Sequence, residues 1–470
     1  MSFTTPVFLF LFFPLTLLGY YLIHPRLKNG FLTLMSLAFY AWAEPKFVLV
    51  FVISIAVNYF LALLVDRFGE EKLLKLSLIV LAMTLNLSLL FYYKYLIFGA
   101  EILNGIFKAN ITLTEIVMPL GISFFTFRSV SYVADVYFGK TKAQKNPINV
   151  ALYISFFPQV SMGPITRSSD FFPQLKERRF DLDTFTDGIK RFIVGMAKKL
   201  IIADSLSTIV ASAFQTSPVE RTVVAAWTGF IGYCLQLFFD FSGYSDMAIG
   251  IGKMFGFKTP ENFDYPYMAT SITDFWRRWH ITLGDFFKNY VYIPLGGNRK
   301  GNVYVHIFIV FLLTGLWHGA AWNFVVWGLW HGSFRLIELA FKRHNKELKV
   351  PAAFKHLYAV AVVGIGWVLF RASDLGAGIK YLGNLIGIGG GGFADSASMF
   401  TLKSSLGLFI IGILFCFPVA RKFHALVQKN QKVRYISDTI VLPVAYMGLL
   451  LVCVSYMQLS SYNPFLYNNF

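Results

Sequence analysis

Three histidines lie in the run 301–334, which contains no lysine, arginine, aspartate or glutamate. They are His306, His318 and His331. Because ionisable side chains are costly to bury in a membrane, histidines in such a run are candidates for function. A neutral imidazole accepts a proton near neutral pH, which suits a general base in a dry site. The competing interpretation is a histidine that bonds to a backbone carbonyl and holds two helices together, and it is favoured for His306.

His318 and His331 occupy identical pentapeptides, GLWHG at 315–319 and at 328–332. On an unbroken helix, their separation of 13 residues corresponds to about 3.6 turns, or roughly 20 Å, on opposite faces. The two side chains can therefore share one small site only if the helix breaks. The glycines permit such a break.

A second segment, 271–290, places apolar side chains at helical spacing. They are Ile272, Phe275, Trp276, Trp279, Leu283, Phe286, Phe287 and Tyr290. His280 follows Trp276 by four residues and shares its face. The pattern predicts one amphipathic helix that lies at the membrane interface or dips into the protein. The alternative is a surface anchor in which the histidine has no chemical role.

Lysine and arginine are frequent between Arg167 and Lys199. Such a stretch can hold the phosphates of a nucleotide-bearing donor, or it can be an ordinary cytoplasmic loop. Three aspartates, Asp135, Asp240 and Asp246, interrupt apolar runs. They are expected to pair with the backbone or with arginine.

The composition is that of a polytopic membrane protein. Of 470 residues, 56% are hydrophobic and only 14% are charged, against about 25% charged in typical soluble domains. The net charge of +17 is explained by lysines and arginines in cytoplasmic loops, so no nucleic-acid partner is predicted. The three cysteines, Cys234, Cys416 and Cys453, lie in apolar runs without a CxxC motif. Neither a metal site nor a structural disulfide is therefore predicted.

Apolar runs predict an all-α protein with about 11 membrane spans and further segments that enter without crossing. The runs are Pro6–Ile23, Asn29–Ala43, Phe47–Val65, Leu76–Tyr93, Asn146–Thr166, Thr222–Phe239, 301–334, Leu357–Phe370, Ser404–Ala420 and Thr439–Phe470. The first lacks the basic flank of a signal peptide and is expected to remain as a span. Basic loops alternate along the first spans, which predicts an N-terminus outside the cell.

Several motifs together resemble a known family. They are MPLGISFFTF at 118–127, FFPQVSMGPITR at 156–167, KKLIIADSL at 198–206, LQLFFDFSGYSDMAIGIGKMFGF at 235–257, ENFDYPY at 261–267, SITDFWRRWHITL at 271–283, YIPLGGNR at 292–299, GLWHGAAWNFVVWGLWHG at 315–332, GWVLFRA at 366–372 and YNPFLY at 462–467. In this order and spacing, the chain resembles the membrane-bound O-acyltransferase (MBOAT) family, of the bacterial alginate O-acetyltransferase type.

The resemblance implies a ring of tilted helices around a central tunnel, in one membrane domain over 1–470. Its parts would be N-terminal spans (1–110), a catalytic core (111–350) and C-terminal spans (351–470). His318 matches the family's catalytic histidine and His280 its second catalytic position, which would orient His318 or bond to the developing oxyanion. His331 also resembles relatives. The resemblance further suggests candidate substrate contacts: Trp276, Trp317 and Asn323 for the walls, and Arg277, Arg278, Arg167 and Lys198 for donor phosphates.

The implied reaction moves an acetyl group from a cytosolic thioester, acetyl-CoA or an acyl carrier, to an extracytoplasmic polysaccharide such as alginate or peptidoglycan. No tightly bound cofactor is expected. The implied location is the bacterial cytoplasmic (inner) membrane, in contact with lipid. Because the chain contains no GxSxG motif, a separate extracytoplasmic esterase-like acetyltransferase is expected as partner.

Three alternatives stay open at this stage. A relative in the same superfamily transfers D-alanine from a carrier protein. The same histidine could acylate a lipid or a protein. A transporter or channel would show paired intramembrane carboxylates or two matching halves, and neither is seen in the sequence.

Overall fold

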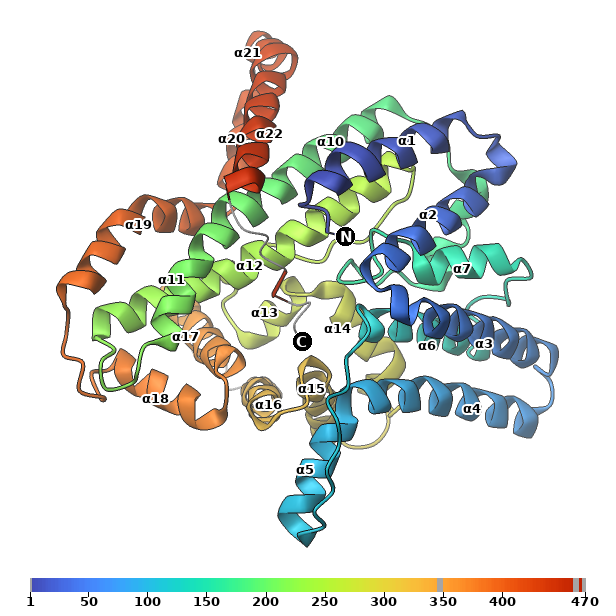
Figure 1. Cartoon of the computed structure of the whole chain (residues 1–470), viewed down its shortest axis with the longest axis horizontal. Helices are drawn as coiled ribbons and strands as arrows, with labels where there is room; N and C mark the ends of the chain where they lie inside the picture. The colour runs from blue at the N-terminus through green and yellow to red at the C-terminus, as the bar shows by residue number, and fades with distance from the viewer. Residues whose placement is uncertain (1, 345–349, 460–464, 467–470) are drawn as a thin grey trace. The chain divides into compact units, whose positions relative to one another are not determined.

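A computed structural model describes residues 2–344, 350–459 and 465–466. These residues form helices and connecting segments, with one isolated antiparallel bridge between Phe263 and Trp279 and no named strand (Figure 1). The predicted all-α class is therefore confirmed.

Six helical segments are long and apolar enough to cross a membrane. They are Pro45–Arg67, Lys72–Phe107, Val223–Met254, Ala352–Arg371, Ser396–Phe415 and Gln431–Gln458, and two shorter apolar helices are Phe8–Leu22 and Val303–His318. Large apolar side chains such as Ile410 and Leu451 point outward from them, as in helices that face lipid. The chain is a polytopic membrane protein, while the count of about 11 spans and the outside N-terminus stay predictions.

The contacts divide the chain into two compact units. Unit 1 comprises the described residues of 1–192 and 244–261, and unit 2 those of Ile193–Gly243 and Asn262–Leu466. These boundaries differ from the predicted divisions after 110 and 350, which stay a prediction.

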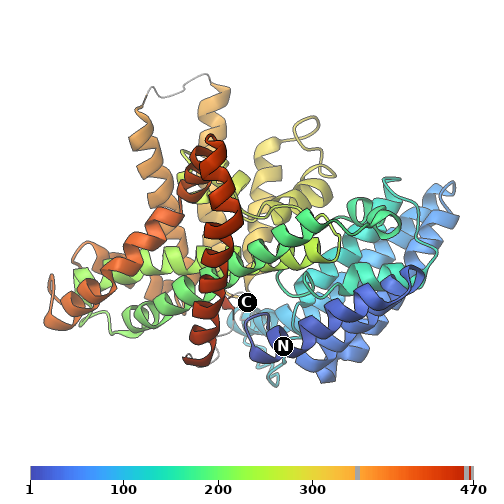
Figure 2. The same cartoon turned by 90° about the horizontal axis from the view of Figure 1, so that it is seen from above.

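Unit 1 contains the N-terminal helices α1 (Phe13–Leu22), α2 (Lys28–Ala43), α3 (Val48–Arg67), α4 (Lys72–Leu90), α5 (Leu96–Phe107), α6 (Ile122–Tyr137), α7 (Pro147–Ser155), α8 (Ser168–Phe171), α9 (Gln174–Glu177) and most of α10 (Leu182–Ala197). Figure 2 shows α3, α4 and α6, in blue to cyan, lying together. Asn58 of α3 and Asn86 of α4 exchange two amide hydrogen bonds of 3.1 and 2.8 Å. In lipid there is no hydrophobic driving force for apolar helices to associate, so hydrogen bonds between polar side chains help to hold them together.

Unit 2 contains α11 (Asp204–Gln215), α13 (Ile272–Arg278), α14 (Ile281–Phe287), α15 (Val303–His318), α16 (Trp322–Arg343), α17 (Ala352–Arg371), α18 (Leu375–Leu385), α19 (Ser396–Phe415), α20 (Val419–Val427), α21 (Gln431–Ile436) and α22 (Leu442–Leu459). Helix α12 (Val223–Met254) contributes residues to both units. Lys199 is buried in unit 2 and pairs with Asp204 at 2.8 Å and Asp240 at 2.7 Å.

The three aspartates that interrupt apolar runs are all paired, as expected, although two bind lysine. Asp240 binds Lys199, and Asp246 binds Arg191 at 2.7 Å. Asp135 accepts a hydrogen bond from Ser168 and lies 3.7 Å from Lys140. Asp240 and Asp246 therefore neutralise buried or half-buried cations, whereas Asp135 lies near an exposed one.

The predicted span Asn146–Thr166 is wrong. Helix α7 ends at Ser155, and a buried non-helical segment follows. Nine residues of helix reach about 14 Å, which is too short to cross the hydrocarbon core. Pro158, Gly163 and Pro164 oppose a continuous helix, and the carbonyls that this leaves free are bound by Arg128.

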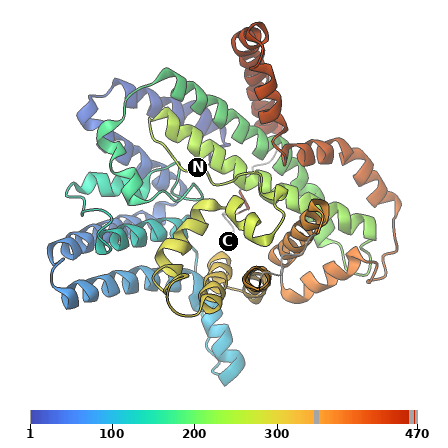
Figure 3. The same cartoon turned by 180° about the vertical axis from the view of Figure 1, so that it is seen from behind.

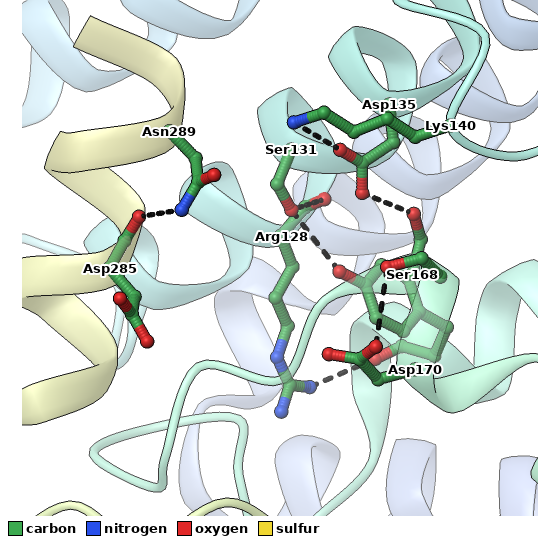
Figure 4. A network of polar contacts seen from close by, with 10 residues as sticks. Arg128, Ser131, Asp135, Lys140, Ser168, Asp170, Asp285 and Asn289 are labelled. Atoms are coloured by element: carbon green, nitrogen blue, oxygen red, sulfur yellow. Dashed lines mark hydrogen bonds and ion pairs between the residues drawn. The ribbon is translucent and has the colours of Figure 1, made fainter. Parts of the chain in front are cut away.

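A buried polar cluster of unit 1 consists of Arg128, Ser131, Tyr153, Gln159 and Thr166. Figure 4 shows Arg128 and Ser131 of this cluster. The Arg128 guanidinium donates to the carbonyls of Tyr153 (2.9 Å) and Ile154 (3.2 Å) and to the Gln159 side chain. Gln159 donates in turn to the Thr166 hydroxyl at 3.0 Å. Irregular backbone is tolerated inside a membrane protein only when such partners satisfy it.

Candidate active site

The run 301–334 forms two helices, because α15 ends at His318 and α16 begins at Trp322. Gly319 is extended, with φ −166° and ψ 150°. A Cβ atom on this residue would approach the Phe324 ring to 2.2 Å. The break that allows His318 and His331 to share a site is therefore present, and it depends on a glycine.

The repeated pentapeptides bring α15 and α16 into backbone contact. A Cβ on Gly315 would lie 3.2 Å from the Gly328 Cα and 2.4 Å from the Phe324 carbonyl. A Cβ on Gly328 would lie 2.5 Å from the Phe311 carbonyl. Small residues allow this close approach between membrane helices, and Figures 1 and 3 both show the two helices side by side.

His318 and His331 both contact the indole ring of Trp327. The ring centroids of Trp327 and His318 are 4.8 Å apart, and those of Trp327 and His331 are 5.0 Å apart. Phe370 of α17 contacts His318 at 5.0 Å. All four side chains are buried, so both histidines lie in an aromatic and dry surrounding.

The predicted single helix over 271–290 is wrong, because it breaks at His280 between α13 and α14. His280 has φ 46° and ψ 53°, the left-handed conformation. A non-glycine residue there costs about 1–3 kcal/mol and persists only where its surroundings hold it, often at functional sites. The backbone of 262–264 supplies this hold: Ile281 donates to the Asn262 carbonyl and Asp264 to the Arg278 carbonyl, both at 3.0 Å.

The break turns His280 into the same aromatic array. Its ring lies 4.7 Å from Phe241 and 6.0 Å from Trp317, and Trp317 lies 4.6 Å from His318. Trp276 contacts His331 at 5.1 Å and Trp327 at 5.7 Å. We refer to the six residues Trp276, His280, Trp317, His318, Trp327 and His331 as the aromatic site.

Asn262 binds His280 directly. The Asn262 Oδ1 and the His280 Nδ1 are 3.0 Å apart, and the same oxygen accepts from the Thr282 hydroxyl at 2.9 Å. Burial lowers the pKa of His280 to about 3. The imidazole is therefore neutral at pH 7.

Comparison with known proteins decides the family. The sequence pattern of MBOAT, the membrane-bound O-acyltransferase family, matches residues 140–370. The chain is 37% identical to the probable alginate O-acetylase AlgI of Pseudomonas putida over 100% of both proteins. It is 34% identical to the peptidoglycan O-acetyltransferase of Helicobacter pylori, over 100% of this chain and 97% of that protein. The chain belongs to the membrane-bound O-acyltransferase family.

A third relative of this O-acyltransferase is matched over a shorter range. The teichoic acid D-alanyltransferase of Bacillus subtilis is 30% identical over 49% of this chain and 61% of that protein. Similarity to the acetylating relatives therefore extends over the whole chain, whereas this D-alanylating relative is similar over about half of it.

The structure of the O-acyltransferase brings together five of the residues singled out from the sequence: His318, His280, His331, Trp276 and Trp317. Asn323 is also buried in unit 2, but its amide donates to the carbonyls of Leu369 (3.5 Å) and Ala372 (3.1 Å) at the end of α17. Its contacts are those of a helix cap.

The four basic candidates of the O-acyltransferase occupy different surroundings. Arg278 pairs with Asp274 at 3.1 Å and Asp264 at 3.6 Å, and thereby braces the His280 turn. Arg277 is exposed. Lys198 lies over the Phe238 ring at 5.9 Å. Arg167 belongs to unit 1, where it precedes α8.

One member of the aromatic site, Trp327, and two residues that contact its histidines, Phe370 and Asn262, were not predicted from the sequence. Trp327 and Phe370 lie in motifs that were recognised, but an aromatic residue in an apolar helix has no distinguishing pattern. Asn262 did carry a signal, since it is a polar residue within ENFDYPY, 18 positions before His280. Only the fold shows that it binds the histidine ring.

Proposed function

We propose that this O-acyltransferase moves an acetyl group from a cytosolic thioester to a hydroxyl group for the O-acetylation of an extracytoplasmic polysaccharide. The observation that carries the proposal is similarity over the whole chain to an alginate O-acetylase and a peptidoglycan O-acetyltransferase. The buried aromatic site provides what the reaction needs. It places His318 and His280, two of its three histidines, in a buried surrounding that disfavours hydrolysis of the thioester.

In this mechanism His318 is the general base. Its imidazole takes the proton of the acceptor hydroxyl while the hydroxyl oxygen attacks the thioester carbonyl carbon. The tetrahedral intermediate then collapses, the C–S bond breaks, and the departing sulfur receives the proton from His318. The products are an O-acetyl ester and a free thiol, so the histidine ends the cycle neutral.

The donor is proposed to be acetyl-CoA or an acyl carrier, used as a substrate and not as a resident cofactor. Exposed Arg277 and half-buried Lys198 are candidates for contacts with its phosphates, because charge-assisted bonds to phosphate are strong. We place the chain in the bacterial inner membrane with its N-terminus outside. The final polymer is reached with an esterase-like extracytoplasmic partner.

D-alanyl transfer is the second candidate function, because of the similarity to a teichoic acid D-alanyltransferase. One experiment separates the two. Ester-linked acetate and ester-linked D-alanine are measured on the surface polymers and peptidoglycan of cells that carry the wild type or His318→Ala, with membrane levels matched by immunoblot. Loss of acetate alone supports acetyl transfer and identifies the polymer, whereas unchanged acetate contradicts the proposal and loss of D-alanine replaces it.

A further inference from the structure

The contacts of Asn262 define the orientation of the His280 imidazole. Asn262 is 1% exposed. Its Oδ1 lies 3.3 Å from the backbone nitrogen of Thr282, 2.9 Å from the Thr282 hydroxyl and 3.0 Å from the His280 Nδ1. One side-chain oxygen therefore lies within hydrogen-bond distance of three groups in the turn between α13 and α14.

The chemistry of the groups around Asn262 determines which atom donates each hydrogen bond and which atom accepts it. A backbone N–H only donates, so the Asn262 atom that faces Thr282 N is the amide oxygen and not the amide nitrogen. An amide oxygen only accepts, so the His280 Nδ1 must carry a hydrogen and donate it. A neutral imidazole carries one such hydrogen, and its Nε2 therefore holds a lone pair.

We infer that Asn262 is a positioning residue, which fixes His280 in the Nδ1–H tautomer and makes its Nε2 a hydrogen-bond acceptor in the active site. This inference rests on the proposed function. The Nε2 atom is buried and has no hydrogen-bond partner in the described part of the chain. Buried hydrogen-bond acceptors in native proteins usually have a donor. The hydroxyl group of the substrate that receives the acetyl group would donate this missing hydrogen bond to Nε2.

The inference distinguishes between the two roles expected for His280. A neutral ring of this tautomer cannot donate from Nε2, so it cannot bond to the developing oxyanion through that atom. It can accept a hydrogen bond from the acceptor hydroxyl or from His318, and so place the reacting proton. Two uncharged aromatic rings, those of Phe241 and Trp317, contact the His280 imidazole. Trp317 in turn contacts His318, which is a titratable residue.

The first test observes the tautomer itself. The full chain is labelled with ¹⁵N-histidine and purified in lipid nanodiscs, and His280→Gln identifies the His280 signals. The expected result is hydrogen on Nδ1 and a lone pair on Nε2 at pH 7. Hydrogen on Nε2 would overturn the inference, even in an enzyme that acetylates normally.

The second test compares two substitutions in membranes that contain the full acetylation system, supplied with acetyl-CoA. Asn262→Asp keeps an acceptor for the Nδ1 hydrogen, and its charge favours the imidazolium. It is expected to retain activity, with the acid limb of the pH profile moved to higher pH. Asn262→Leu removes the acceptor and is expected to lower kcat by about 10–100-fold, the usual cost of an orienting partner, with a small change in KM for acetyl-CoA.

A matched control is Asn384→Leu, which removes another buried asparagine of unit 2 that bonds to Arg221. It is expected to lower membrane levels without altering the pH profile of the remaining enzyme. Equal losses in Asn262→Asp and Asn262→Leu at matched levels, with an unshifted pH profile, would contradict a positioning role. Failure of the proposed function is a separate result, in which His318→Ala retains acetylation.

Discussion

The polar cluster around Arg128 in unit 1 and the aromatic site in unit 2 are both buried, yet they are built in opposite ways. In the polar cluster, the groups of Arg128, Tyr153 and Gln159 bind one another and the irregular backbone. In the aromatic site, ring nitrogens of Trp276, His280, Trp327 and His331 have no hydrogen-bond partner in the described part of the chain. The first arrangement satisfies its own polar groups, whereas the second leaves donors and acceptors that the proposed substrate would bind.

The difference shows how a buried ionisable residue should be interpreted in a membrane protein. Arg128 is as buried as His280, but the hydrogen bonds of its guanidinium are already made inside the protein, whereas the His280 Nε2 has no partner in the described part of the chain. Burial alone therefore does not mark a catalytic group. A group whose bonding capacity is not used internally is the stronger candidate.

His318→Ala is expected to have the largest effect. Removal of a general base lowers the rate by about 10²–10⁴-fold. Thermal unfolding in detergent should change little in comparison with the rate. The measurement is ester-linked acetate at matched protein levels. A His318→Ala variant that unfolds at a much lower temperature and yet remains active would show that His318 stabilises the fold and is not needed for the reaction.

Arg128→Met should lower the stability of the protein and leave its activity nearly unchanged. It leaves the carbonyls of Tyr153 and Ile154 without their donor, at a cost of roughly 3 kcal/mol in the free energy of unfolding. Activity per folded molecule should remain near that of the wild type. The measurements are the unfolding midpoint and the acetylation rate per folded molecule. An Arg128→Met protein as stable as the wild type would show that the polar cluster does not stabilise the fold.

Stability should also depend on pH through His280. Its pKa is about 3 in the folded chain and about 6.5 when unfolded. Below pH 6.5 the unfolded chain binds a proton that the folded chain excludes, so stability falls as pH falls. From pH 6.5 to 5 the loss is about 2 kcal/mol. Unfolding of His280→Gln should show a shallower pH slope than the wild type, and equal slopes would contradict a buried neutral ring.

Gly328→Ala tests the contact that aligns the aromatic site. The new Cβ would lie 2.5 Å from the Phe311 carbonyl, so α15 and α16 must separate at a cost of about 1 kcal/mol. Because His318 and His331 lie on these two helices, acetylation should fall by more than the stability loss explains. Gly407→Ala on α19 is the control, since a Cβ there has no atom within 4 Å.

Much of the site could be predicted from the sequence, because it resides in contiguous motifs. The GLWHG repeat and FWRRWH contain His318, His331, Trp317, Trp276 and His280, which the fold brings together. The break in 301–334 was also foreseeable, since glycine is a poor helix former and four glycines lie in the two pentapeptides.

What could not be predicted depends on distant partners. The turn at His280 is held by Asn262, and no local pattern shows that bond. The run 146–166 is apolar enough for a span, but its backbone is satisfied by Arg128 on another helix. Arg167 was grouped with Lys198 by proximity in the sequence, whereas the two belong to different units.

The break at Gly319 has an electrostatic consequence for the two histidines of the repeat. His318 occupies the last turn of α15, where the helix dipole places about half a negative charge. His331 lies in the interior of α16, away from either end. The helix dipole therefore favours a positive ring at the first position and not at the second. Identical pentapeptides thus differ in their affinity for charge, and the one that ends a helix would support the imidazolium of the proposed general base.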